Sequence, residues 1–158
     1  IACVTSDLPI IDRRERLEGY RQALAEYGIT PDRSWVISVP FNEEGGERAA
    51  HQLLNCGIPF TAAVTFNDVM AAGIMRILHL KGITLPQQLS IVGFDDVVMA
   101  RYLYPALTTM HYPVERMARC ASQLAIQLFK GATQQPCVNS FAAELVVRDS
   151  VLPPGSGN

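Results

Sequence analysis

Polar and aromatic side chains stand where several predicted strands of this 158-residue chain end. Asn67 and Asp95 each follow an apolar run, Phe41 closes another, and Arg16 lies near the start of the first predicted helix. In an open parallel sheet, ligands bind in the crevice beyond the carboxyl ends of the strands. We therefore expect these four side chains to meet at one edge of the sheet and to form a binding site there.

This set of side chains suits the hydroxyl groups of a sugar. A carboxylate accepts hydrogen bonds, a guanidinium donates them through a planar fork, and a carboxamide does both, so adjacent hydroxyls can be held in pairs. Phe41 could pack against the apolar face of a pyranose ring. A phosphate fits less well, because no glycine-rich loop follows a predicted strand and the carboxylates would repel it.

Each of these side chains also has a simpler structural interpretation. Asn67 is well placed to cap the helix that follows it, and Asp95 could simply shape a turn without binding a ligand. Phe41 could belong to the core, and Arg16 could pair with Asp12 four residues earlier on one helix face. Taken singly, these structural roles are favoured. Their convergence on one edge shifts the balance towards a site.

Alternating apolar runs and helical patterns position this edge. Strands and helices that alternate at this spacing predict an α/β fold, with a doubly wound parallel sheet covered on both faces. The predicted strands are 1–6, 35–41, 61–66, 89–94, 106–112 and 141–150, and the predicted helices are 12–28, 43–57, 68–82 and 113–131. Within the first helix, Asp12 and Glu15 have capping-box spacing, and Leu17, Tyr20, Leu24 and Tyr27 form an apolar stripe.

Composition excludes several classes of function. The formal net charge is −2 and the Lys and Arg residues are scattered, so the chain lacks the basic surface that nucleic acid requires. No apolar run is long enough to cross a bilayer. The cysteines show no C-x-x-C pair and the histidines no ligand spacing, so we expect neither disulfides nor a metal. The cysteines are predicted to be small core residues in a reducing cytoplasm: Cys3, Cys56, Cys120 and Cys137.

Catalysis is not indicated. The chain has no G-x-S-x-G elbow for a serine nucleophile, and no lysine follows a predicted strand. Asp95 and Asp96 resemble the acidic pair of a phospho-acceptor domain, but that chemistry needs a further strand-end Asp and a Lys. We therefore expect a binding protein, without an enzymatic activity and without a cofactor.

The predicted helix 68–82 is apolar on nearly every side, and Met70, Ile74 and Leu78 are among its apolar residues. Two interpretations stay open. The helix could be enclosed within one copy of the protein, or it could also pack against a second copy.

Four segments taken together resemble the effector-binding core of the LacI/GalR family of bacterial transcription repressors. They occur in the order found in that family and span essentially the whole chain: RRERLEGYRQAL, TAAVTFNDVMAAGIMRIL, GITLPQQLSIVGFDD and PALTTMHYPVERM. The resemblance implies a Rossmann-like, periplasmic-binding-protein-like subdomain that forms the C-terminal portion of a two-subdomain core. It also implies that the chain is a piece of a longer protein.

The resemblance assigns roles to individual positions. It matches the sugar-contacting residues of the family to Arg16, Asn67 and Asp95, the ligand-packing aromatic to Phe41, and a less regular contact to Asp12. Val114 stands where some members carry an aromatic residue. Four segments follow from the family's chain path: residues 1–110 as the C-terminal subdomain, 111–135 as a crossover helix of the absent N-terminal subdomain, 136–152 as a returning strand, and 153–158 as a flexible tail.

The function that the resemblance implies is sensing of a sugar, D-galactose, in a cytoplasmic repressor. Such a protein forms a homodimer, here through the helix that carries Met70, Ile74 and Leu78. It binds operator DNA only through an N-terminal headpiece that these residues do not include, and it has no membrane partner. Three rivals stay open: a periplasmic-type sugar-binding protein for transport, a metabolic enzyme with a flavodoxin-like sheet, and a structural domain without a ligand.

Overall fold

The computed structural model of the chain describes residues 1–131 and 138–153. A six-stranded sheet in the order β2-β1-β3-β4-β5-β6 runs through the molecule. Its strands are β1 (Ala2–Ser6), β2 (Val36–Val39), β3 (Ala62–Thr65), β4 (Ser90–Phe94), β5 (Thr108–His111) and β6 (Glu144–Val146). The first five strands pair in parallel, as predicted, whereas β6 runs antiparallel to β5 at the edge. The doubly wound α/β fold is therefore confirmed, with one antiparallel strand added.

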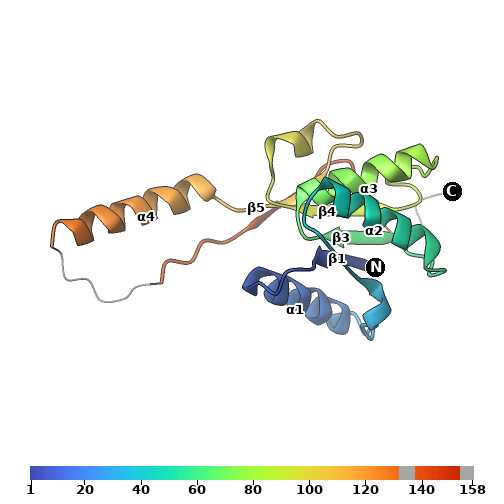
Figure 1. Ribbon diagram of the computed structural model, residues 1–158, viewed down its shortest axis with the longest axis horizontal. Coiled ribbons are helices and arrows are strands. Elements are labelled where there is room, and N and C mark those ends of the chain that lie inside the picture. Colours follow the sequence, from blue (N-terminus) through green and yellow to red (C-terminus); the bar gives the residue numbers. More distant parts are fainter. Residues whose placement is uncertain (132–137, 154–158) are drawn as a thin grey trace.

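Helices lie on both faces of this sheet (Figure 1). Helix α1 (Ile11–Glu26) packs on one face, where Cys3, Tyr20 and Leu24 form a small core. Helices α2 (Glu43–Asn55) and α3 (Asp68–Leu80) cover the other face over a larger core. Short 3₁₀ turns at Arg33–Trp35 and Val98–Arg101 complete the connections.

The start of α1 differs from the prediction. The residue that precedes the helix is Ile10, which makes no side-chain cap, so Asp12 lies inside the first turn and the predicted capping box is wrong. The apolar stripe is correct at Tyr20 and Leu24, which are buried, and wrong at Tyr27, which is 84% exposed beyond the helix end.

Most of helix α3 is covered by its own chain. Met70, Ile74 and Leu78 have side chains that are between 0% and 1% exposed, because they pack between α2 and the sheet. These three side chains are therefore not available to a second copy of the protein. Arg76, His79 and Leu80 of the same helix are exposed, so a dimer contact through α3 stays a prediction. Burial within one chain explains most of the apolar residues of α3, whereas Leu80 at its end is 65% exposed.

Glycines let α2 and α3 approach closely. A Cβ added at Gly73 would lie 2.1 Å from the Glu43 carbonyl oxygen, and one added at Gly46 would lie 2.2 Å from the Met70 carbonyl oxygen. The two helices therefore touch backbone to backbone, which fixes α3 and the residues at its start.

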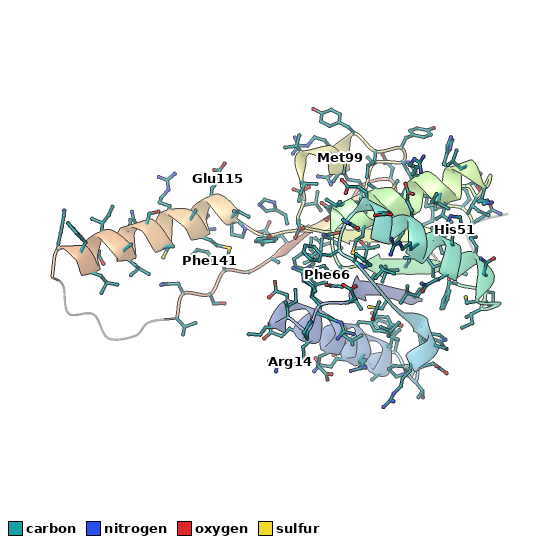
Figure 2. The ribbon with its side chains drawn as sticks, viewed as in Figure 1. Arg14, His51, Phe66, Met99, Glu115 and Phe141 are labelled. Carbon is teal, nitrogen blue, oxygen red and sulfur yellow. The ribbon has the colours of Figure 1, made fainter. Side chains whose placement is uncertain are left out.

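Helix α4 (Val114–Phe129) projects away from the sheet on a stalk formed by β5 and the returning chain (Figure 1). None of its residues is buried. Its apolar side chains include Ile126, Leu128 and Phe129, which are 54%, 57% and 94% exposed. In the chain that returns from α4 to the sheet, the Phe141 ring centroid lies 5.9 Å from the guanidinium carbon of Arg116. We call α4 and this returning chain the arm; Figure 2 labels Glu115 on α4 and Phe141 on the returning chain.

The cysteine prediction is correct only in part. Cys3, Cys56 and Cys120 carry free thiols. Cys3 is buried, as expected for a core residue, but Cys56 is exposed after α2 and Cys120 is partly exposed on α4. Cys137 lies outside the described residues.

Candidate functional site

Two phenylalanine rings form the floor of the site at the carboxyl edge of the sheet. Val64 of β3 pairs with Val92 of β4, and Phe66 and Phe94 each lie two residues further along the chain. Side chains alternate along a strand, so the two rings stand side by side on the face that α1 covers. Figure 2 shows Phe66 between the sheet and α1.

Arg16 reaches this floor from the second turn of α1. Its guanidinium carbon lies 4.4 Å from the centroid of the Phe66 ring and 3.7 Å from that of the Phe94 ring. Its Nη1 donates a hydrogen bond to the carbonyl oxygen of Phe66. Burial lowers the pKa of Arg16, and the negative charge of Asp95 opposes this most strongly, followed by that of Asp12. The guanidinium stays charged, since arginine does not lose its proton in proteins.

Asp95 stands at the end of β4 in a strained backbone conformation. Its φ of 114° lies in a region that non-glycine residues rarely adopt, and its backbone N–H donates to the carbonyl oxygen of Met110 at 2.9 Å. Burial raises the pKa of the carboxyl group, while Arg16 and a hydrogen bond from the Tyr112 hydroxyl act in the opposite direction. Asp95 is thus a half-buried carboxylate that faces a cation.

Arg16 and Asp95 influence each other electrostatically without forming a direct ion pair among the described residues. A donor fork and an acceptor therefore face the same edge, and a small group could be held by both. A polar ligand with adjacent hydroxyls has this requirement.

Asn67 is used largely by the backbone. It is 8% exposed, its Oδ1 accepts from the backbone N–H of Met70 at 2.8 Å, and its Nδ2 donates to the carbonyl oxygen of Phe41 at 3.2 Å. The amide thus caps α3 and ties that helix to the end of β2, in agreement with the structural alternative. One Nδ2 hydrogen and one Oδ1 lone pair remain for a ligand.

Phe41 and Asp12 lie at the rim. Phe41 is 46% exposed, so it is not a core residue, and its ring meets the Phe66 ring edge-on at 6.3 Å. It also lines a groove of about 320 Å³ with Asp7 and Pro40. Asp12 is exposed one helical turn before Arg16 and acts on Arg16 and Asp95 through its charge. The structure therefore brings the predicted residues to one edge, with Phe66 between Phe41 and Arg16.

A buried carboxylate beneath the site was missed by the sequence prediction. Asp68 is 0% exposed; its Oδ1 accepts from the Thr109 hydroxyl at 2.5 Å and its Oδ2 from the Val97 backbone N–H at 2.9 Å. Burial raises the pKa of this carboxyl group against both hydrogen bonds. These bonds hold the turn after β4, which contains Asp95. The partners of Asp68 are distant in sequence, so the sequence pattern does not reveal this role.

Tyr112, Phe66 and Phe94 were also missed. Tyr112 lies in the connection between β5 and α4, and its ring centroid is 5.8 Å from that of Phe94. In the sequence, Phe66 and Phe94 look like the last core residues of their strands. Only the strand register, which the sequence does not contain, places them under Arg16.

Asp96 has a structural role next to the site. It is 12% exposed, its Oδ1 lies 2.5 Å from Arg148 Nη2, and its Oδ2 lies 3.2 Å from His111 Nδ1. Arg148 Nη1 also donates to the carbonyl oxygen of Leu107 at 2.7 Å. Asp96 therefore links the turn after β4 to β5 and to the last described segment.

Residues 1–131 and 138–153 contain neither a metal-binding cluster nor a membrane-spanning helix. In this part of the chain, no group of three or more His, Cys, Asp or Glu side chains could hold a metal ion. No helix there is long and apolar enough to cross a membrane.

The family of the chain follows from comparison with known sequences. Residues 1–151 match the family described as periplasmic binding protein-like domain. The chain belongs to this family. Within it, the chain is similar to LacI/GalR-type transcriptional regulators, as its sequence motifs predict.

Relatives with curated names are transcriptional regulators. The chain is 42% identical to the HTH-type transcriptional regulator GalR of Escherichia coli over 154 residues, which are 98% of this chain and 45% of the relative. It is 40% identical to GalS of Salmonella typhimurium over 151 residues, or 96% of this chain and 44% of the relative. The chain thus spans less than half of the length of these relatives, and no enzyme is among them.

Solved structures show the same fold. The Escherichia coli transcriptional repressor ascG matches with a TM-score of 0.87 at 33% identity, over 96% of this chain and 55% of that one. The complex of the transcriptional regulator CelR with cellobiose matches with a TM-score of 0.89 at 29% identity, over 95% of this chain and 46% of that one. The chain therefore has the effector-domain fold of these regulators.

Proposed function

We propose that the chain senses a sugar, D-galactose, as the effector region of a transcriptional repressor. One observation carries this proposal: Arg16 and Asp95 present a donor fork and an acceptor at one edge without a direct ion pair in the described part of the chain. Asn67 retains spare hydrogen-bonding capacity beside them, and the exposed ring of Phe41 offers an apolar surface. The names of the relatives GalR and GalS and the cellobiose bound to CelR support a sugar rather than another ligand.

The proposal extends to a second lobe that closes over the sugar. Residues 111–131 would belong to the crossover helix of that lobe, and residues 138–152 would return to the sheet. The rest of the predicted segments, 132–137 and 154–158, lies outside the described residues. Support comes from α4, which projects from the sheet, has no buried residue and exposes large apolar side chains. An apolar helix surface of this kind is normally covered.

Regulation would follow from the difference in sugar affinity between two arrangements of the lobes. A ligand shifts an equilibrium only by its differential affinity for the two states. In the full-length protein, sugar would favour the arrangement that separates the DNA-binding parts and so would weaken operator binding. DNA would be contacted by a region outside these 158 residues, as the HTH-type names of the relatives suggest. Homodimerisation, by a surface other than Met70, Ile74 and Leu78, and a cytoplasmic location belong to the same proposal.

The test uses the full-length protein that contains this chain. Calorimetric titration compares D-galactose with D-glucose, D-fucose and a purine base, and a gel shift measures operator binding with and without each ligand. We expect galactose to bind and to release the operator. Binding of the purine alone would overturn the sugar assignment, and tight sugar binding without any effect on DNA would favour a transport protein.

A further inference from the structure

The rings of Phe66 and Phe94 lie close to the guanidinium of Arg16. Both ring centroids lie within 4.4 Å of the guanidinium carbon, inside the range of an energetically useful cation–π contact. The rings come from different strands, and the hydrogen bond to the Phe66 carbonyl adds a third fixed contact. Arg16 is therefore held before any ligand arrives.

We propose that Phe94, together with Phe66, is a positioning residue that sets the sugar specificity of the site by fixing the guanidinium of Arg16. This inference rests on the proposed sugar-binding function. Phe94 does not need to touch the sugar; it acts by directing the donors of Arg16 to one hydroxyl group.

The donors of Arg16 make this possible. A guanidinium carries five N–H groups in one plane, and one of them is used on Phe66. When both rings and this carbonyl hold the plane, its remaining donors point in fixed directions. An arginine loses considerable rotamer freedom when it binds a ligand, and an arginine that is already held loses less.

Phe94 also contacts the partner of the other charged group. Its ring lies 5.8 Å from the Tyr112 ring, and the Tyr112 hydroxyl donates to Asp95. The Phe94 ring thus lies against Arg16, which donates to the ligand, and against Tyr112, which supports the acceptor Asp95. This explains why a large aromatic is placed at the end of β4, directly before Asp95.

A purely structural role for Phe94 predicts a different result. If the ring only filled space, its loss would loosen the edge of the sheet and lower the affinity for every ligand by a similar factor. If the ring orients Arg16, its loss weakens only those ligands that carry the hydroxyl group that Arg16 binds.

The experiment compares ligands that differ by one hydroxyl. In the full-length protein, affinities for D-galactose and for its 2-, 3-, 4- and 6-deoxy forms are measured by calorimetry for wild type, Arg16→Lys, Phe94→Leu and Phe94→Tyr. Arg16→Lys identifies the hydroxyl that Arg16 binds. The deoxy sugar that lacks this hydroxyl is the one whose affinity the substitution does not lower. Tyr27→Leu is the matched control, since Tyr27 is an exposed aromatic at the far end of α1.

We expect Phe94→Leu to lower the affinity for galactose about five- to tenfold. The affinity for the deoxy sugar identified by Arg16→Lys should stay within about twofold of the wild-type value. Phe94→Tyr, which keeps the ring, should restore most of the affinity for galactose, and Tyr27→Leu should have no effect. If Phe94→Leu does not fold, Phe94→Met supplies an apolar side chain without a ring. Equal weakening of all sugars, or no weakening, would overturn the inference while the sugar site stands. A wild-type protein that binds none of the sugars would overturn the proposed function and this inference with it.

Discussion

At the scale of single residues, the site depends on charged groups that are only partly solvated. Asp95 and Arg16 both pay for burial: the pKa of the carboxyl group is raised and that of the guanidinium is lowered. Each charge partly offsets the burial of the other. This edge of the sheet therefore holds two groups that would both be stabilised by a ligand able to hydrogen-bond to each of them.

Replacing Asp95 by Asn should lower the affinity for the sugar. The amide keeps the shape of the side chain but loses the negative charge, and hydrogen bonds to charged groups contribute about 1.5–3 kcal/mol. We expect Asp95→Asn to reduce galactose affinity roughly 10- to 100-fold, as measured by calorimetry on the full-length protein. Unchanged affinity would show that Asp95 does not contact the ligand.

The same substitution should change how stability depends on pH. Because the pKa of Asp95 is raised in the folded protein above its ordinary value of 3.8, the charged form destabilises the fold above the raised pKa. This cost disappears as the pH falls through the raised pKa towards 3.8. We therefore expect Asp95→Asn to raise the unfolding temperature at neutral pH, with a difference that shrinks on acidification. A difference that grows as the pH falls would contradict the direction of the shift.

Sequence patterns predicted single residues with uneven success. Arg16, Asn67 and Asp95 could be placed at one edge because each follows from strand or helix position alone. The use of Asn67 by the backbone was foreseen as an alternative, since Asn is a favoured helix cap. The contacts of Asp68 with Thr109 and Val97 could not be foreseen, because they join residues 41 and 29 positions apart.

At the scale of elements, the close crossing of α2 and α3 positions the cap at Asn67. Sequence periodicity predicted both helices and identified the apolar surface of α3. It could not show whether that surface is covered by α2 or by a second copy, because both environments select the same residue types. The glycines at the crossing were the missing signal, since they permit a backbone contact within one chain.

A methyl group at this crossing should be costly. Because a Cβ at Gly73 would lie 2.1 Å from a backbone oxygen of α2, we expect Gly73→Ala to lower the free energy of unfolding by about 2–3 kcal/mol. Gly19→Ala is the matched control, since Gly19 is an exposed glycine in α1 whose Cβ would meet nothing within 4 Å. That change should stabilise the protein by up to about 1 kcal/mol. Urea unfolding compares the two, and equal effects would contradict this account of the crossing.

At the scale of the whole molecule, the segment after β6 is bonded to the sheet. Ser150 is completely buried; its backbone carbonyl accepts from Ile91 at 2.9 Å, and its hydroxyl donates to the Ile91 carbonyl at 2.6 Å. Arg148 joins the same segment to Asp96. The sequence predicted a strand over 141–150, but the observed strand covers only Glu144–Val146. Beyond it, single bonds replace the regular ladder: the Arg148 backbone N–H donates to the Thr108 hydroxyl, and the Ser150 hydroxyl donates to the Ile91 carbonyl.

Breaking the Asp96–Arg148 pair should destabilise the whole molecule. The two side chains are 12% and 14% exposed, and removing one partner of a largely buried pair leaves an uncompensated charge. We expect Asp96→Ala to cost about 3 kcal/mol of unfolding free energy. Glu47→Ala, which breaks the more exposed pair with Arg76, should cost less than about 1 kcal/mol. Similar costs in urea unfolding would show that burial does not govern these pairs.

The position of β5 and β6 has a mechanical consequence. The chain leaves the sheet towards α4 along β5 and comes back along β6, its antiparallel neighbour at the outer edge. The two strands that carry α4 therefore lie at one edge of the sheet and are joined to each other by ladder hydrogen bonds, so the base of this extension is held as a pair of strands. A one-residue insertion within either paired strand would shift this register and turn the side chains beyond it to the opposite face.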